Sequence, residues 1–144
     1  MKITAKAPWI DHVGDIPATL DYPTGSMYDA LKETADKYPD AVALDFMGKS
    51  TTYKSFVEKI EACAKSLKTI GVREGDRVTI AMPNCPQSVS LFYAVNLVGG
   101  VCNMIHPLSA EKEIEFYLNE SESVTVITLD QFYHKIEAIR QNTR

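Results

Sequence analysis

Three short apolar runs, separated by two stretches with helix signals, constrain the fold of this chain more than any other feature. The runs span residues 78–82, 101–105 and 124–128. Asn84 can cap the first helix, which tolerates Pro86 in its first turn and runs to about Val98, and Ser109 can cap the second. Strand, helix, strand, helix, strand at this spacing predicts two right-handed βαβ units and a parallel sheet.

A further helix and a hairpin precede these units. Ser26 is a good N-cap with Asp29 three residues later, and Tyr38-Pro39-Asp40 ends the helix. Its expected core face consists of Met27, Ala30, Leu31, Thr34, Ala35 and Tyr38. Residues 41–46 then read as a strand that turns at 47–49 into a short strand at 50–53, so we predict a β-hairpin.

The hairpin leads into a second amphipathic helix that ends at Gly71, where a left-handed C-cap residue is favoured. Its apolar stripe consists of Phe56, Val57, Ile60, Cys63, Ala64, Leu67 and Ile70. Residues 131–144 read as one more helix. Parallel sheets are usually covered on both faces and continued at their edges, so the expected fold class is α/β with a partial, mainly parallel sheet, flanking helices and a β-hairpin.

The first 25 residues differ from the rest because they contain prolines but no apolar period. We interpret residues 1–25 as an extended leader that lies across a surface, with Trp9 and Ile10 as its anchors. Residues 26–144 form the α/β portion.

Composition excludes several classes of protein. With 45% hydrophobic and 24% charged residues among 144, the chain can bury the core of one globular domain. A net charge of −4 without a basic block argues against nucleic acid as a partner, and no apolar stretch approaches the roughly 20 residues of a membrane span. The first residues also lack a signal-peptide layout, so we expect a cytoplasmic location. Cys63, Cys85 and Cys102 are widely and irregularly spaced, which indicates free, buried thiols.

Two glycine segments resemble phosphate-binding motifs only in part. Gly48-Lys49-Ser50-Thr51 matches the end of a P-loop, but Ala43 stands where that motif requires glycine. Gly99-Gly100 closes a helix, whereas a dinucleotide fingerprint opens one. We therefore expect a β-turn at the first segment and a tight backbone passage at the second.

No histidine or carboxylate set has the spacing of a catalytic or metal site. His12, His106 and His134 lack helical partners, although His106 follows the carboxyl end of a strand, where open α/β sheets place their ligands. The glutamates expected to support a helix dipole rather than acid–base chemistry are Glu111, Glu113 and Glu115. The residues alone therefore predict no catalytic, cofactor-binding or metal-binding residue in this chain.

Several segments, in order, resemble the beginning of AMP-forming acyl-CoA synthetases. They are Tyr38-Pro39-Asp40-Ala41-Val42-Ala43-Leu44, Thr51-Thr52-Tyr53 with Phe56, Gly71-Val72-Arg73-Glu74-Gly75-Asp76-Arg77-Val78, Met82-Pro83-Asn84-Cys85-Pro86-Gln87 and Val98-Gly99-Gly100-Val101. The features that resemble the long-chain fatty-acid branch are Trp9, Ile16-Pro17, Pro83-Asn84-Cys85-Pro86-Gln87 and Pro107-Leu108 with Glu113. The family usually has Asn at His106 and Tyr-Thr at Ser109-Ala110, and some relatives have Arg at Leu108 that helps to hold CoA phosphate.

The resemblance implies a two-step reaction in the parent protein. A fatty carboxylate attacks the α-phosphate of ATP in the presence of Mg²⁺, and the CoA thiolate then displaces AMP from the acyl-AMP. The family's phosphate loop, its Thr-Glu pair for Mg²⁺, its ribose-binding Asp and its mobile Lys match no segment of residues 1–144. The resemblance therefore implies a truncated N-terminal part of a ligase that is inactive by itself.

Two alternatives remain open at the level of sequence. One is a stand-alone, non-catalytic α/β interaction module, and the other is a relative that activates an aryl or amino acid. In each case uncovered strand edges predict that the chain self-associates.

Overall fold

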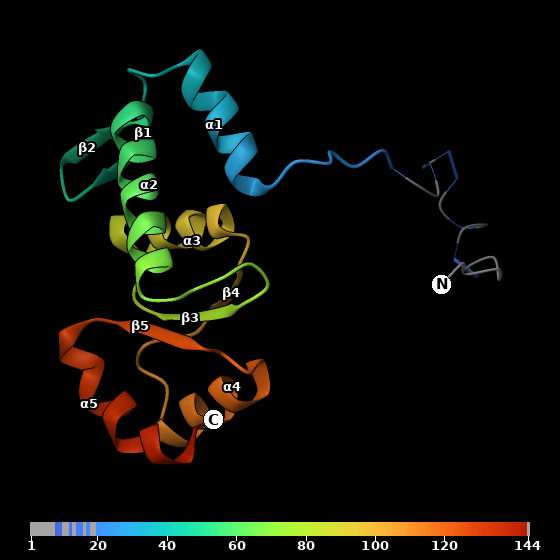
Figure 1. Cartoon of the computed structure of the whole chain (residues 1–144). Coiled ribbons are helices and arrows are strands. Elements are labelled where there is room, and N and C mark those ends of the chain that lie inside the picture. The colour runs from blue at the N-terminus through green and yellow to red at the C-terminus, as the bar shows by residue number, and fades with distance from the viewer. Residues whose placement is uncertain (1–7, 10–11, 13, 16, 18–19, 144) are drawn as a thin grey trace.

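The computed structural model describes residues 8–9, 12, 14–15, 17 and 20–143. Residues 20–25 are all exposed, and this part of the chain runs outward from the beginning of the first helix (Figure 1). Trp9, expected to anchor the leader, is 65% exposed. Ile10, the other expected anchor, lies outside the described residues, so the leader's path over a surface stays a prediction.

Helix α1 (Met27–Lys37) begins as predicted, with Ser26 as its cap. The N–H of Asp29 donates to Ser26 Oγ over 3.1 Å, and the Asp29 carboxylate accepts the N–H of Ser26 over 2.7 Å. The expected core face was partly wrong, because Met27, Ala30 and Tyr38 are exposed and Tyr28 is buried.

Two polar contacts explain why Tyr28 faces the core. Its N–H donates to Asn96 Oδ1 over 2.9 Å, and its hydroxyl donates to Glu61 Oε1 over 3.1 Å. Because both partners belong to neighbouring helices, the ring is held between them with its polar groups satisfied. Apolar periodicity alone does not detect such a residue.

The predicted hairpin is present as strands β1 (Val42–Phe46) and β2 (Lys49–Thr52), paired antiparallel. Met47 and Gly48 both have positive φ, as a two-residue type I′ turn requires. Residue 53, expected to extend the second strand, instead begins helix α2 (Tyr53–Thr69). The reason is that Thr52 acts as the N-cap, with its hydroxyl accepting the N–H of Ser55 over 3.3 Å.

Helix α2 buries most of its predicted stripe. The buried members are Phe56, Val57, Ile60, Ala64 and Leu67. Cys63 is half-buried, and Ile70 is 64% exposed because it is the C-cap residue at the point where the helix ends. Gly71 follows with φ +99°, as the predicted left-handed residue.

A three-stranded parallel sheet forms the centre of the domain, as predicted. Strand β3 (Arg77–Ala81) lies between β4 (Val101–Met104) and β5 (Thr125–Thr128). Both pairings are parallel, with Val78 opposite Cys102 on one side and Thr125 on the other.

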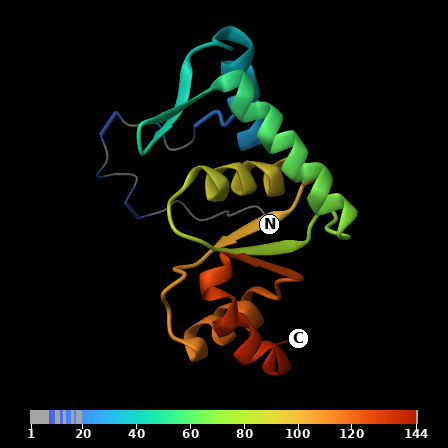
Figure 2. The ribbon, with the colours of Figure 1, turned by 90° about the vertical axis from the view of Figure 1, so that its left-hand side faces the viewer.

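Helices cover both faces of this sheet (Figures 1 and 2). Helix α3 (Pro86–Val98) covers one face, with α2 and α1 beyond it, while α4 (Glu111–Ser121) and α5 (Asp130–Ile139) cover the other. A short 3-10 helix, Arg140–Asn142, follows α5. The larger core lies on the α3 side and a smaller one, around Ile114, Leu118 and Ile139, on the α4–α5 side.

Two predicted helix caps were each one residue too early. Cys85, not Asn84, precedes α3, and its N–H donates to Ser88 Oγ over 3.1 Å. Ala110, not Ser109, precedes α4, and its N–H donates to the Glu113 carboxylate over 3.0 Å. In both cases a side chain of the first turn accepts the N–H of the cap residue, which is one half of a capping box.

The segment Gly99-Gly100 is a tight backbone passage, as expected. Gly99 ends α3 with φ +83°. A Cβ atom on Gly100 would lie 3.1 Å from both the Asp76 carbonyl oxygen and Val95 Cγ1. The N–H of Val101 donates to the same Asp76 oxygen over 2.8 Å, which starts the pairing of β4 with β3.

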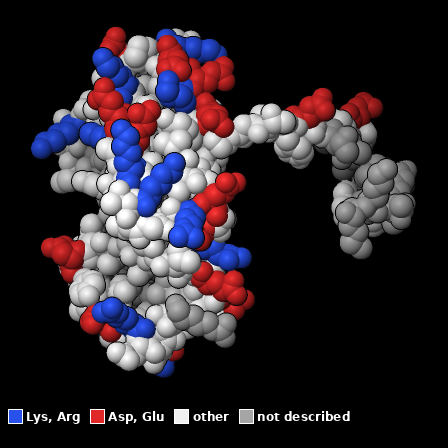
Figure 3. Space-filling model, in the orientation of Figure 1, with Lys and Arg blue, Asp and Glu red and all other residues white. Residues whose placement is uncertain are grey.

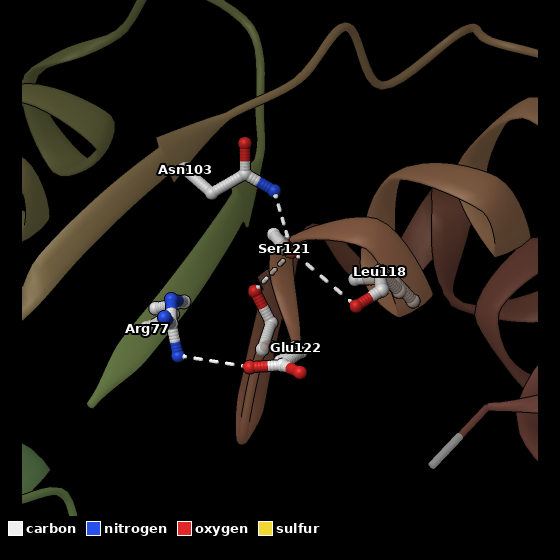
Figure 4. Close-up of polar contacts among 6 residues, drawn as sticks. Arg77, Asn103, Leu118, Ser121 and Glu122 are labelled. Carbon is white, nitrogen blue, oxygen red and sulfur yellow. Dashed lines mark hydrogen bonds and ion pairs between the residues drawn. The ribbon is translucent and has the colours of Figure 1, made fainter.

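A buried polar network fixes α4 and the start of β5 beneath the sheet. The hydroxyl of Thr79, fully buried in β3, lies 2.7 Å from Ser123 Oγ and accepts from Asn103 Nδ2 over 2.9 Å. Asn103 Nδ2 also donates to Ser121 Oγ over 3.1 Å (Figure 4). Because every member of this network has a partner, burial of these groups is compatible with a stable core.

Charges of both signs are mixed on the surface. On the face shown in Figure 3, lysine and arginine side chains alternate with aspartate and glutamate over α1 and α2. Arg77 and Glu122 form an exposed ion pair of 3.3 Å beside the polar network (Figure 4). Among the described residues, no helix is both long and apolar enough to cross a membrane.

Candidate functional site

A hollow of about 460 Å³ opens at the carboxyl edge of the parallel sheet. All three strands contribute to it through the residues that end or follow them. The lining consists of Met82, Pro83, Asn84, Met104, Ile105, His106, Pro107, Leu108, Gln131 and Phe132.

The order of the strands explains why a hollow forms here. The chain leaves β3 toward α3 on one face of the sheet, and it leaves β4 and β5 toward α4 and α5 on the other. Loops that diverge to opposite faces leave a crevice at the carboxyl ends of neighbouring strands, where open α/β sheets bind their ligands.

The lining is chemically neutral. Apolar side chains dominate it, and Asn84, His106 and Gln131 supply its polar groups. None of the ten lining side chains is an aspartate, glutamate, lysine or arginine. The hollow therefore fits an uncharged, partly apolar group and offers no side-chain charge to a phosphate.

His106 is exposed and lies in this lining, just after the carboxyl end of β4 as its sequence position indicates. Its Nδ1 accepts the N–H of Leu108 over 3.2 Å, so the neutral ring carries its proton on Nε2. His12 and His134 are exposed residues outside the lining. Within the described part of the chain, no group of three or more His, Cys, Asp or Glu residues could hold a metal ion.

The three glutamates at the beginning of α4 occupy first-turn or helix-surface positions. Glu111 and Glu113 lie in the first turn, where their charge favours the helix dipole. Glu115 pairs with Lys112 over 3.7 Å and accepts from Asn142 over 3.1 Å. The structure therefore supports the helix-stabilising interpretation over acid–base chemistry.

The P-loop-like segment is a hairpin turn, as expected. Gly48 lies in the turn itself, and Lys49 and Ser50 belong to β2. Ser50 Oγ donates to the Asp45 carboxylate across the hairpin over 2.7 Å. The segment joins two strands, so it has no helix N-terminus with which to bind a phosphate.

The three cysteines are free and half-buried. Burial raises the pKa of the Cys63 thiol, and it raises the pKa of the Cys102 thiol to about 11. A thiol with a raised pKa is mostly protonated at neutral pH and is a poor nucleophile. Cys63 and Cys102 are therefore packing residues, in agreement with the sequence interpretation.

Sequence reasoning identified only one residue of the hollow, His106, as a candidate. It missed the contributions of Met82, Gln131 and Phe132, which follow or end the two other strands. The available signal was the parallel sheet itself, because three strands that run in one direction must end at one edge.

The fold is of the open, parallel-sheet α/β class, with a hollow at the carboxyl edge of the sheet. The family model described as "AMP-binding enzyme" matches residues 31–144 of this chain. The chain belongs to this family.

Curated relatives match over nearly the whole chain. The long-chain-fatty-acid–CoA ligase of Bacillus subtilis is 34% identical over 140 residues, which are 96% of this chain and 25% of that protein. The 2-succinylbenzoate–CoA ligase of Oceanobacillus iheyensis is 26% identical over 78% of this chain and 26% of its own length. This chain thus spans about a quarter of the length of the curated relatives that it matches.

Solved structures share the fold. The N-terminal domain of FACL13 from Mycobacterium tuberculosis superposes with a TM-score of 0.76 at 30% identity, over 80% of this chain and 29% of that chain. The anthranilate CoA ligase AuaEII has a TM-score of 0.79 at 24% identity, over 85% of this chain and 24% of its own. Both matches confirm the predicted partial α/β fold.

Proposed function

We propose that this chain is the N-terminal part of an ATP-dependent, AMP-forming fatty-acid–CoA ligase. The parent protein joins a fatty carboxylate to AMP with release of pyrophosphate, and CoA thiolate then displaces AMP to give acyl-CoA. The observation that carries this proposal is the ordered similarity to long-chain-fatty-acid–CoA ligases over 96% of the chain.

The chain itself contributes scaffold and one wall of a ligand path. The neutral hollow at the carboxyl edge fits the uncharged portions of CoA, such as its amide-bearing arm or its adenine ring. Leu108 supplies no cation for a CoA phosphate, and no described carboxylate cluster suits Mg²⁺. ATP and Mg²⁺ therefore bind elsewhere in the parent, and the isolated chain is inactive.

The proposal also covers the cellular location of the parent protein and the self-association of this chain. Three free cysteines fit a reducing compartment, so we place the parent in the cytoplasm. Strands β4 and β5 are both edge strands without a charged residue, which favours self-association of this chain through a strand edge.

The coding sequence beyond Arg144 and the activity of its product test the proposal together. We expect an in-frame Ser/Gly/Thr phosphate loop, and we expect the continuous protein to form acyl-CoA and AMP from a C16 fatty acid, ATP and CoA. A stop codon directly after Arg144 would support the stand-alone interaction module instead.

Similarity to 2-succinylbenzoate–CoA ligase favours an aryl carboxylate as the second candidate substrate class. Parallel assays of the continuous protein with a fatty acid, an aryl carboxylate and an amino acid distinguish these classes. Acyl-AMP formation only with the aryl or amino acid would contradict the fatty-acid assignment while leaving the adenylate-forming chemistry intact.

A further inference from the structure

Lys135 makes an unusual pair of contacts beside the hollow. It lies on α5 and is half-buried. Its ammonium group donates to the carbonyl oxygens of Leu108 and Ser109 over 3.2 and 2.9 Å. Within residues 20–143 no carboxylate lies within ion-pair distance of this ammonium group, so the two carbonyl groups are its partners.

The contacted segment, residues 106–110, belongs to the loop between β4 and α4. Its own N–H groups have local partners: Leu108 donates to His106 Nδ1, Ser109 to the His106 carbonyl and Ala110 to Glu113. The bonds from Lys135 instead reach across 26 and 27 residues of sequence. They are thus the contacts that fix the already folded turn against α5.

This loop also supplies three of the ten residues that line the hollow. Pro107 is buried, while Leu108 is 62% exposed and faces the hollow as part of its wall. Since His106, Pro107 and Leu108 move with the loop, the position of the loop determines the shape of this wall. Hydrogen bonds from a charged donor are stronger than neutral ones, so one ammonium group can hold two carbonyl groups in place.

We infer that Lys135 is a positioning residue that fixes the 106–110 loop as a wall of the hollow. The Lys135 ammonium group donates to two backbone carbonyl groups and is not part of the lining, so the lining of the hollow remains neutral. The inference depends on the proposed function only for the identity of the ligand, CoA, whose affinity should follow the position of the loop.

Three variants of the full chain test this inference. Lys135→Met removes the ammonium group at similar volume, Lys135→Arg keeps a charged donor, and Lys59→Met is a matched loss of an exposed lysine on α2, on the other side of the sheet. Amide hydrogen exchange of residues 108–110 measures the loop directly, with β3 amides and the unfolding midpoint as references for global stability.

We expect Lys135→Met to speed exchange at residues 108–110 by about tenfold or more, the scale of a lost hydrogen bond to a charged group. Strand β3 should change much less, and Lys135→Arg should restore most of the protection. Equal exchange at residues 108–110 in Lys135→Met and Lys59→Met would overturn the inference.

A CoA titration followed by NMR signals of His106 and Gln131 gives an independent readout. We expect Lys135→Met to weaken CoA binding severalfold and Lys135→Arg to retain it, because the wall of the hollow is displaced only in the former. Loosening of the loop with unchanged CoA affinity would contradict a role of the loop in binding. Failure of the unmodified chain to bind CoA would contradict that ligand, while hydrogen exchange would still decide the role of Lys135.

Discussion

At the scale of single residues, the hydroxyl of Thr79 connects the central strand to the two strands beside it. It joins β3 to Asn103 of β4 and to Ser123 before β5. We expect Thr79→Val, which keeps the shape of the side chain, to lower the free energy of unfolding by about 1–3 kcal/mol, because the half-buried Asn103 and Ser123 each lose one of their two partners. Urea denaturation measures this loss.

Thr69→Val is the matched control for this experiment. Thr69 is exposed near the end of α2, and its hydroxyl donates only to the Lys65 carbonyl of its own helix. Its replacement should change stability by less than about 0.5 kcal/mol. Equal effects of the two substitutions would show that the buried network contributes no more than a surface hydroxyl.

Cys102 should be slow to react in the folded chain. Burial raises its pKa from 9.0 to about 11, so at pH 9 the folded chain has roughly fiftyfold less Cys102 thiolate than the unfolded chain. Alkylation with iodoacetamide, with and without urea and followed by peptide mass spectrometry, measures the difference. Equal rates in the two states would contradict the burial of this thiol.

The same pKa shift gives the sign of a stability change with pH. Between pH 9 and 11 the unfolded chain releases the Cys102 proton that the folded chain retains, so this thiol's contribution to stability falls as the pH rises. The contribution is complete below pH 9. Cys102→Ala should therefore flatten the decline in stability across this interval.

Individual residues could be predicted from the sequence where local chemistry determines them. Ser26 as a cap and Gly71 as a left-handed residue follow from spacing and backbone preference alone. Tyr28 and Lys135 could not be predicted, because their partners lie on helices and loops distant in sequence. Long-range polar contacts leave no periodic signal in a single sequence.

At the scale of elements, the connection from α3 to β4 passes close to the backbone of Asp76. Gly100→Ala should lower the free energy of unfolding by about 1–3 kcal/mol, because the new Cβ would lie 3.1 Å from the Asp76 carbonyl oxygen. Gly25→Ala is the control, since its Cβ would meet Asp29 at an ordinary 3.4 Å. Thermal unfolding of both variants measures the contrast, and a neutral Gly100→Ala would contradict the close approach.

The strands and helices themselves were predictable, while their arrangement was only partly so. Apolar runs of four or five residues between amphipathic stretches gave the parallel sheet. The order β4-β3-β5, with β3 in the centre, depends on which helix covers which face, and that packing is not encoded in any one segment. The hollow at the carboxyl edge follows from this order, so its full lining could not be derived beforehand.

At the scale of the whole molecule, two uncharged strand edges predict self-association. We expect multi-angle light scattering to show the molar mass rising with concentration, because β4 and β5 offer unpaired backbone groups without charged side chains. Val101→Lys, at a half-exposed position of β4, should shift the equilibrium toward monomer. A strict monomer at high concentration would contradict the prediction.

At the centre of the account, this chain supplies scaffold and one wall of a ligand path, while ATP and Mg²⁺ bind elsewhere in the parent protein. This chain covers about a quarter of its relatives' length and contains a neutral hollow but no described carboxylate cluster for a metal. Calorimetric titration of the chain with ATP and Mg²⁺ tests the claim most directly. We predict no binding at micromolar ATP concentrations, whereas saturable, magnesium-dependent binding in that range would contradict the account.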